Sequence, residues 1–517
     1  MLFNSYLFLF AFFPAALAAY FVAGQFGERA RLAAILGASF AFYAAWDVRF
    51  LALLGGSIAA NFVCGKLITR ALRDRRVTRA SALLGLGIGF DLLTLAIFKY
   101  AHFFVANYNA LSGDNIVIGK IILPLGISFF TFEQIGYLVD LRRGSPYRAD
   151  ILQFAVFVSF FPRLVAGPIL RFGEIGPQLR NSAKRVPLAD LAVGLSIFFI
   201  GLAKKTILAD SIGAYVAPPF ALATSGKPID FFVAWATALA YTCQLYFDFS
   251  GYTDMAIGAA RCFGIHFPMN FDSPYKSVNI IEFWRRWHMT LSRFLRDYLY
   301  FSLGGSRRGR IRRYTNLMIT MVLGGLWHGA SWTFVAWGSL HGLYLVINHA
   351  WHGMRGKFDL RGQPSGVGRL FGLAMTFLAV VVAWVFFRAP TFAAALSILQ
   401  GMVGLHGASL PKSFAGAVAP LQPLLRFVGI AFVNGDGART VFEWCWIFLL
   451  LAIAFAAPNT QEIMARFEPV LDPPRTNLER APILWRPSLG WGIAIGTVAF
   501  VAMISIVRVS EFLYWQF

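Results

Sequence analysis

Charged side chains are scarce in this 517-residue chain. Asp, Glu, Lys and Arg make up 14% of the residues, whereas hydrophobic types make up 58%. Soluble domains carry roughly 25% charged residues, so the composition excludes a soluble enzyme with a large core. Apolar stretches of about 20 residues, the length that crosses the hydrocarbon of a bilayer, recur along the chain. The sequence therefore predicts an all-α polytopic membrane protein.

Acidic residues are scarcer than basic residues. The chain has 25 Asp and Glu against 46 Lys and Arg, and its formal net charge is +21. The arginines gather in short segments between apolar runs, as at 70–79 and 307–313. Lys and Arg concentrate in cytoplasmic loops of membrane proteins, so no nucleic-acid partner is expected. With these loops and the polar stretch 461–486 in the cytoplasm, both chain termini are predicted on the opposite side.

Several catalytic motifs are missing as well. The four cysteines are scattered without a CxxC pair, and the sequence contains no Walker A loop, no HExxH and no GxSxG. These absences argue against a disulfide framework, a metal site and nucleotide hydrolysis. No metal or permanently bound cofactor is expected.

The apolar segments predict a single membrane domain, 1–517. Some candidate spans overlap, such as 315–335 and 333–350, so some of the segments are predicted to be re-entrant. Roughly ten to twelve segments are predicted to cross the membrane. Further candidates are 414–433 and a last helix at 488–508, which is followed by an aromatic tail at 509–517.

One long stretch, 241–300, mixes apolar and charged residues. Irregular backbone is not tolerated against lipid, so this stretch is predicted to be buried in protein or to line a water-filled cavity. Its second half, 279–300, predicts an amphipathic helix, because Trp284, Trp287, Leu291 and Leu295 form a stripe at helical spacing.

Two histidines lie in apolar surroundings. His328, in the string GGLWHGASW, is an ionisable residue within a membrane segment, which indicates a functional site; a neutral ring hydrogen-bonded between helices explains it equally well. A neutral imidazole can also take a proton from a hydroxyl near pH 7. His288 lies between tryptophans and hydroxyl residues, where an interfacial helix is the alternative. The other six are interpreted as interfacial or packing residues: His102, His266, His341, His349, His352 and His406.

Charged residues near these histidines have two interpretations. The carboxylates Asp248, Asp254 and Glu133 could orient a catalytic histidine or form structural pairs with arginines. Four arginines could bind a phosphate-bearing donor from the cytoplasm, although membrane topology alone also explains them: Arg285, Arg286, Arg293 and Arg296.

Five strings in order resemble the bacterial branch of the membrane-bound O-acyltransferase (MBOAT) family. They are PLGISFFTF at 124–132, FPRLVAGPI at 161–169, YFDFSGYTDM at 246–255, WRRWHMTLS at 284–292 and LWHG at 326–329. The resemblance covers roughly 90–345, and it is strongest to the membrane subunits that serve alginate O-acetylation.

The resemblance implies a ring of helices around a tunnel through the bacterial inner membrane, with both termini periplasmic. It implies His328 and His288 as the catalytic residues, acetyl-CoA as the cytoplasmic donor and a periplasmic serine-hydrolase-like partner that modifies a polysaccharide. His328 would act as general base. His288 would stabilise the thioester oxygen, orient it or help to transfer the proton.

The chain ends in FLYWQF at 512–517, and alginate-type members have a similar aromatic ending, here with Trp515 where Phe is usual. The resemblance suggests Tyr514 as an acyl carrier, whereas an interfacial aromatic anchor is the alternative. Two rival functions remain. One is a polysaccharide or small-molecule transporter, although the internal repeats typical of that class are not evident. The other is an acyltransferase with a carrier-protein donor or a lipid acceptor.

Overall fold

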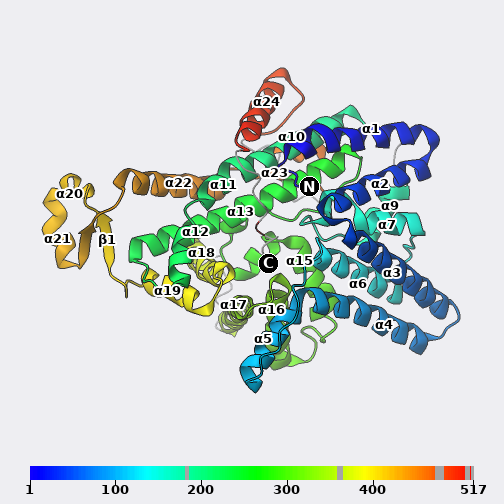
Figure 1. The fold of residues 1–517 in the computed structure, drawn as a ribbon, viewed down its shortest axis with the longest axis horizontal. Coiled ribbons are helices and arrows are strands. Elements are labelled where there is room, and N and C mark those ends of the chain that lie inside the picture. Colours follow the sequence, from blue (N-terminus) through cyan, green and yellow to red (C-terminus); the bar gives the residue numbers. More distant parts are fainter. Residues whose placement is uncertain (181–185, 358–364, 472–482, 507–512, 514–517) are drawn as a thin grey trace.

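A computed structural model covers the chain, and the structure describes residues 1–180, 186–357, 365–471, 483–506 and 513. Helices form nearly all of the described fold (Figure 1), as the composition predicts. One two-stranded sheet lies in an arm that leaves the body.

Most of the first third of the chain forms a group of helices at one side of the body (Figure 1). In this group α1 packs on α2, α3 packs on α4, and both α3 and α4 pack on α6. The elements are η1 (Phe8–Phe12), α1 (Phe13–Ala23), η2 (Gly24–Phe26), α2 (Glu28–Asp47), α3 (Arg49–Arg73), α4 (Val77–Leu95), the π-helical turn η3 (Ala96–Tyr100), α5 (Ala101–Ser112), α6 (Ile127–Arg142), α7 (Ile151–Ser159), α8 (Phe161–Leu164) and α9 (Phe172–Arg180).

The longest helix, α13 (Phe231–Cys262), is the spine of the body and is buried over most of its 32 residues. It packs along α10 (Leu188–Ala203). A Cβ atom at Gly201 would overlap the carbonyl of Gly251, and one at Gly258 would overlap that of Gly194. Small residues thus allow the two backbones to touch, as in membrane helix pairs. The elements between them are η4 (Lys204–Ala209), α11 (Asp210–Gly213) and α12 (Ala217–Thr224).

The segment predicted as one amphipathic helix, 279–300, is interrupted. The structure divides it into α14 (Ile280–Arg286), α15 (Met289–Phe294) and a π-helical turn, η6 (Leu295–Tyr300). The break falls at His288, whose φ of 42° lies in the left-handed region. A non-glycine residue there costs on the order of 1–3 kcal/mol, so the surrounding contacts must hold this conformation.

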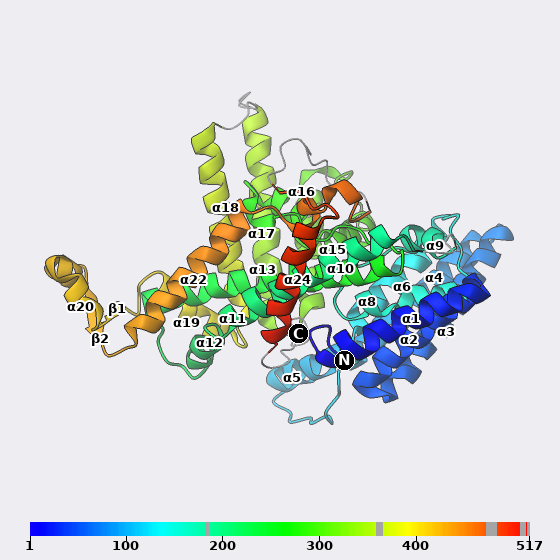
Figure 2. The same ribbon diagram turned by 90° about the horizontal axis from the view of Figure 1, so that it is seen from above.

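Helices α16 (Gly309–His328) and α17 (Trp332–Lys357) pack against each other and close the centre of the body. Helix α17 also lies beside α18 (Gly366–Arg388), and both stand upright in Figure 2. Short elements complete this part: η5 (Pro274–Lys276), α19 (Phe392–Met402), α23 (Thr460–Ile463), η8 (Ala465–Phe467) and α24 (Leu489–Ile504).

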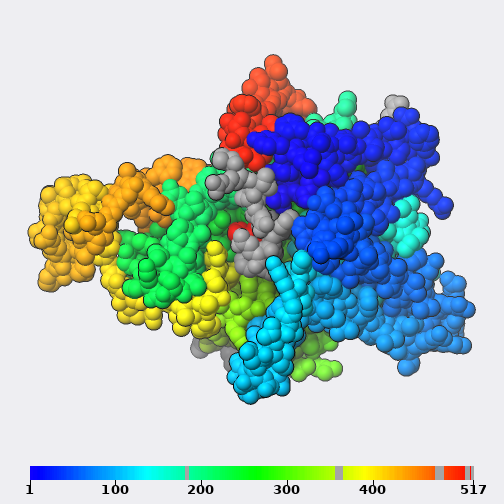
Figure 3. All heavy atoms as spheres, in the orientation of Figure 1, coloured from blue at the N-terminus to red at the C-terminus, as the bar shows by residue number. Residues whose placement is uncertain are grey.

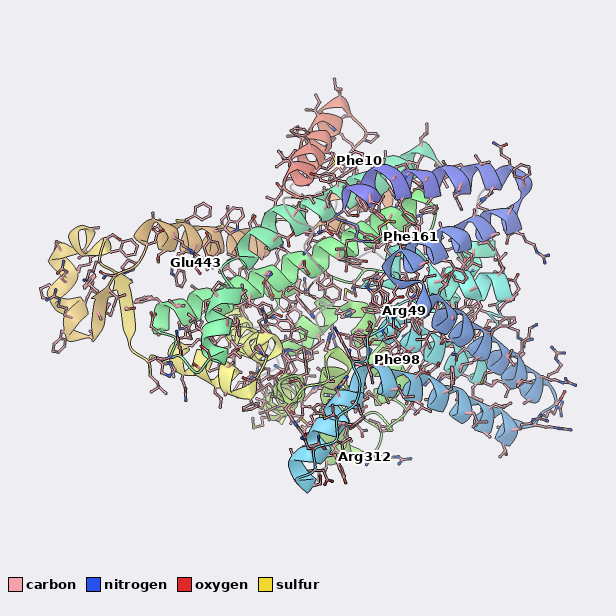
Figure 4. The ribbon with its side chains drawn as sticks, in the orientation of Figure 1. Phe10, Arg49, Phe98, Phe161, Arg312 and Glu443 are labelled. Atoms are coloured by element: carbon pink, nitrogen blue, oxygen red, sulfur yellow. The ribbon has the colours of Figure 1, made fainter. Side chains whose placement is uncertain are left out.

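The candidate span 414–433 is wrong. This region forms an arm that stands clear of the body (Figure 3) and joins it through α22 (Gly437–Ala456), where Figure 4 labels Glu443. Pro420 and Pro423 begin new short helices and Gly429 turns with φ 85°, so no continuous helix forms. The arm contains β1 (Ala408–Pro411), α20 (Phe414–Ala417), η7 (Ala419–Leu421), α21 (Gln422–Phe427) and β2 (Ile430–Val433), with β1 and β2 parallel.

Within the described residues, six helical segments are long and apolar enough to cross a membrane. They are Phe8–Phe26, Arg49–Arg73, Val77–Ser112, Leu188–Gly213, Gly366–Arg388 and Gly437–Ala456. The helices α13, α16 and α17 are also long, with 32, 20 and 26 residues, but carry polar side chains. A multi-pass membrane protein with a polar interior follows from this pattern.

Candidate active site

His328 is the last residue of α16 and is only 4% exposed. Three aromatic rings surround its imidazole, with centroids 4.9 Å away in Trp327, 5.0 Å in Trp337 and 5.2 Å in Phe387. All three rings stand edge-on to it. The histidine therefore lies in a buried aromatic cage at a helix end.

Two residues of η3 cap that helix end. Lys99 Nζ lies 2.5 Å from the Trp327 carbonyl and 3.1 Å from that of His328, and Tyr100 Oη donates to the Leu326 carbonyl at 2.7 Å. The last carbonyls of a helix lack partners within it, and a cation is favourable there. Lys99 and Tyr100 thus fix the position of His328.

Lys99 was not predicted as a site residue, although the sequence around it indicated a function. It is a lysine inside an apolar run of more than ten residues, and an intramembrane charge indicates a function by the same rule that identified His328. Its third partner, the Ser128 hydroxyl at 3.3 Å, lies on α6, and Trp327 Nε1 donates to the Ser128 carbonyl at 3.4 Å. Helix α6 therefore supports the same wall.

His288 is fully buried at the break between α14 and α15. Its Nδ1 lies 3.1 Å from Asn270 Oδ1, which also accepts the Thr290 hydroxyl at 2.8 Å and the Thr290 amide at 3.3 Å. The Met289 amide donates to the Asn270 carbonyl at 2.9 Å. Asn270, which the sequence did not single out, thus holds the left-handed turn that presents His288.

The two histidines lie close to one indole, that of Trp327. The ring centroid of Trp327 is 4.9 Å from that of His328 and 6.3 Å from that of His288. The residues that the sequence selected 40 positions apart are therefore brought to one site, from two different elements. Two imidazoles beside one another in a dry interior can share the work of moving a proton.

The three carboxylates of the sequence analysis form buried ion pairs. Asp248 pairs with Lys205 at 2.6 Å, and Asp254 pairs with Lys204 at 2.6 Å. Glu133 pairs with Arg163, which is 1% exposed. These contacts are structural ion pairs, which was one of the two interpretations of the carboxylates. Two of the three cations are lysines, whereas arginines were expected. The contacts described for these carboxylates include none to a histidine.

Three of the four selected arginines line a cavity of 420 Å³: Arg285, Arg293 and Arg296. Its wall also includes Trp284, Met289 and Thr290, so it reaches the His288 turn. Arg286 is not part of this wall and instead pairs with Glu282 at 2.9 Å. A cationic cavity that ends beside His288 has the charge that a phosphate-bearing donor requires.

Acidic neighbours offset part of that charge. Arg293 pairs with Glu174 at 2.6 Å, and Arg296 pairs with Asp297 at 2.7 Å. Burial raises the pKa of the Asp297 carboxyl, but hydrogen bonds from Arg296 and Arg171 outweigh this effect and hold that pKa below its ordinary value. Asp297 therefore stays ionised. Arg285 has no ion pair among the described residues and is the cation most available to a ligand.

Aromatic rings connect this cavity with His328. Trp284 lines the cavity and lies 5.1 Å from His341, which lies 4.9 Å from Trp337, the indole that touches His328. His341 is fully buried in these stacks, which fits its interpretation as a packing residue. The described residues contain no cluster of His, Cys, Asp and Glu that could hold a metal ion.

Tyr514 lies outside the described residues. Its neighbour in the chain, Leu513, is described and is buried, and its amide donates to Asp248 Oδ2 at 3.1 Å. The residue before Tyr514 is therefore in the interior, against the spine helix α13.

Fold and site together define a polytopic helical membrane protein with two buried histidines and a cationic cavity whose wall includes the residues that follow His288, an arrangement suited to group transfer. Comparison with known proteins specifies the class. Residues 128–389 match MBOAT, the membrane-bound O-acyltransferase family, and the chain belongs to this family. It is an acyltransferase.

The relatives that are similar to this chain differ in the acceptor that their names give. The peptidoglycan O-acetyltransferase of Helicobacter pylori is 41% identical over 79% of this chain and 81% of its own. A probable alginate O-acetylase, AlgI, of Azotobacter vinelandii is 37% identical over the full length of both. The teichoic acid D-alanyltransferase of Streptococcus thermophilus is 31% identical over 51% of this chain and 68% of its own. The rival interpretation as a transporter is thereby replaced by that of an acyltransferase.

Proposed function

We propose that the protein transfers acetyl groups from cytoplasmic acetyl-CoA through the inner membrane for O-acetylation of a periplasmic or extracellular polysaccharide. The observation that carries the proposal is the pair His288 and His328 beside the ring of Trp327. Relatives of similar length are named O-acetylases of alginate and of peptidoglycan, which supports a polysaccharide as the final acceptor.

In this proposal the phosphates of acetyl-CoA bind near Arg285 in the cavity of 420 Å³. His328 accepts the proton of a hydroxyl, the hydroxyl oxygen attacks the thioester carbonyl carbon, and the carbon–sulfur bond breaks. The departing thiolate takes the proton from the imidazolium, so that an ester and free CoA are formed. The buried aromatic cage favours the neutral imidazole that this step requires.

The tautomer of His288 supports one of the roles considered for this residue. An asparagine carbonyl oxygen only accepts hydrogen bonds, so Nδ1 of His288 carries the proton toward Asn270 Oδ1. The unprotonated nitrogen is then Nε2, which accepts a proton rather than donating one. This arrangement supports proton transfer as the role of His288 over stabilisation of the thioester oxygen.

The hydroxyl acceptor in this scheme is Tyr514 or a serine of a periplasmic, serine-hydrolase-like partner. The buried amide contact between Leu513 and Asp248 supports Tyr514. Both chain termini are periplasmic, with the arginine-rich turn between α3 and α4 in the cytoplasm. A ring of about ten to twelve helices around a tunnel would connect the two sides.

The central test is polysaccharide acetylation in cells that produce His328→Ala or His288→Ala at normal membrane levels. Loss of a general base lowers turnover by on the order of 10²–10⁴-fold. Undiminished acetylation by His328→Ala would refute the general-base role. Trp332, which is exposed and outside the cage, provides a control as Trp332→Phe.

A carrier-protein donor is the second candidate, because one relative is a teichoic acid D-alanyltransferase. Purified protein supplied with either acetyl-CoA or an acylated carrier protein separates the two. Acetyl transfer from acetyl-CoA alone, with stoichiometric release of CoA, is the expected result. Transfer from the carrier protein alone would overturn the proposed donor.

A further inference from the structure

A second cationic cavity, of 810 Å³, lies at the arginine-rich end of α3 and belongs to no part of the proposed reaction. Four cations line it, namely Lys66, Arg70, Arg73 and Arg148, together with one carboxylate, Asp74. Among the described residues, none of these four cations takes part in an ion pair. Four positive charges against one negative leave an excess of three, which attracts an anion.

An apolar groove of 240 Å³ continues from this cavity along α3 and α4. Val63 and Leu67 line both spaces, so the groove adjoins the cavity at these two side chains. The groove has apolar walls from Leu86 and Phe90, which are 71% and 42% exposed. Both helices belong to candidate membrane spans, so this exposed apolar surface faces lipid.

Membrane topology explains why arginines follow α3, but it does not explain the combination of features. A loop that only marks the cytoplasmic side needs neither a cavity nor an adjoining groove. A lipid with an anionic headgroup needs both, because guanidinium groups bind its phosphate and an apolar channel accepts an acyl chain. Basic pockets beside membrane helices on the cytoplasmic side have this property.

We infer that Lys66, Arg70, Arg73 and Arg148, with the groove between α3 and α4, form a binding site for one anionic phospholipid. The phosphate lies among the four cations, and an acyl chain passes Val63 and Leu67 into the groove. A soluble phosphate would satisfy the cations but leave the groove unexplained, so a lipid is the occupant that accounts for both.

The site has a direct structural link to α6. Tyr137 of α6 lines the cavity, and Gln134 of α6 accepts hydrogen bonds from Ser57 and Asn61 of α3. One turn and a half earlier on α6, Ser128 contacts Lys99 and Trp327. A bound lipid therefore stabilises the helix pair that supports the wall of the histidine site.

The test is a titration of the full-length, detergent-purified protein with dioleoylphosphatidylglycerol, followed by native mass spectrometry. Dioleoylphosphatidylcholine and glycerol phosphate serve as the zwitterionic and the soluble probes. The site variant is K66Q/R70Q/R73Q. The matched control is R75Q/R76Q/R79Q, which removes three charges from the turn after α3 and the first residues of α4, at positions that do not line the cavity.

We expect the wild type and the control to bind phosphatidylglycerol more tightly than phosphatidylcholine. A basic residue near the surface contributes about fivefold to such binding, so the site variant should lose on the order of 100-fold in affinity. Ala60→Phe, which fills the groove, should weaken phosphatidylglycerol binding with all four cations intact. It also serves as the test if the triple variant is not stable.

Three results would overturn the inference. The first is an equal loss of affinity for phosphatidylglycerol in the site variant and the control, because the total positive charge of this region would then explain the binding. The second is equal affinity for the two lipids in the wild type. The third is displacement of phosphatidylglycerol by glycerol phosphate at equal concentration, because the site would then bind a soluble anion. None of these results bears on acetyl transfer.

Discussion

The backbone amide of Leu513 donates a hydrogen bond to the carboxylate of Asp248 at 3.1 Å, across 265 positions of sequence. Both residues are buried, and the same carboxylate pairs with Lys205 at 2.6 Å. Leu513 is therefore held by a charged group on the spine helix. A carboxylate that accepts from both an ammonium and an amide makes stronger hydrogen bonds than neutral partners do.

Removing this amide tests whether the contact positions the chain end for transfer. Leu513→Pro deletes the N–H and leaves Tyr514 in place, so a buried acceptor loses a partner. We expect acetylation to fall by about tenfold, measured as acetyl groups per unit of polysaccharide. Leu513→Ala keeps the N–H and should retain most activity. Equal activity of the two variants would contradict a positioning role for this contact.

The tyrosine itself has a separate test. Tyr514→Phe removes only the hydroxyl that would carry the acetyl group. If Tyr514 is the carrier, transfer to the polysaccharide stops while the protein remains in the membrane at normal amounts. Mass spectrometry of the C-terminal peptide after incubation of the wild type with acetyl-CoA should detect an added acetyl group. Normal transfer by Tyr514→Phe would leave the partner serine as the direct acceptor.

The donor cavity can be tested with two adjacent arginines. Arg285 lines the cavity, whereas Arg286 pairs with Glu282 and does not. Arg285→Gln should raise the KM for acetyl-CoA about tenfold, since a charged contact to phosphate is lost, with little change in kcat. Arg286→Gln should leave KM close to that of the wild type. The same increase in both variants would indicate a general effect of charge.

Lys99 should affect turnover rather than donor binding. Lys99→Met removes contacts to the carbonyls at the end of α16, and hydrogen bonds to charged groups contribute about 1.5–3 kcal/mol. The expected result is a decrease in kcat of about tenfold or more, with KM nearly unchanged. Lys99→Arg keeps a cation at the helix end and should recover part of the rate. A change in KM alone would contradict this role.

Asn270 should be as important as the histidine that it holds. Asn270→Ala removes the acceptor shared by His288 and Thr290, and the left-handed turn loses the contacts that maintain it. Displacement of a catalytic group by about 1 Å costs on the order of 100-fold in rate, and kcat/KM should fall by this amount. Asn270→Asp, which keeps an acceptor, should lose less. Equal loss in both variants would indicate a general folding defect instead.

The sequence predicted the chemical class of the site better than its geometry. His288 and His328 stood out because ionisable residues are costly in a membrane, and the structure brings both to Trp327. The role of Asn270 could not be predicted, because an asparagine before a turn is common in any loop. The break at His288 was hidden because the stripe from Trp284 to Leu295 fits a continuous helix. Its interruption depends on tertiary contacts that spacing does not reveal.

For the fold as well, features that depend on local sequence were predicted, and features that depend on tertiary contacts were not. Composition and apolar runs predicted helices and a membrane location, which depend only on local sequence. The segment 414–433 was predicted to span the membrane because its residues are apolar on average. Pro420 and Pro423 prevent that helix, since proline removes a backbone donor and clashes with the preceding turn. The partners of Asp248 and Asp254 were beyond prediction, because the lysines lie more than forty positions earlier.

The buried pair Arg163–Glu133 also constrains how the protein enters the membrane. Helix α8 has four residues, far fewer than a crossing requires, so Arg163 is buried by neighbouring helices, where an arginine without a partner is costly. Glu133 is synthesised 30 residues earlier, on α6. We therefore expect the translocon to retain α6 until Arg163 emerges, and to release the two segments together as one unit.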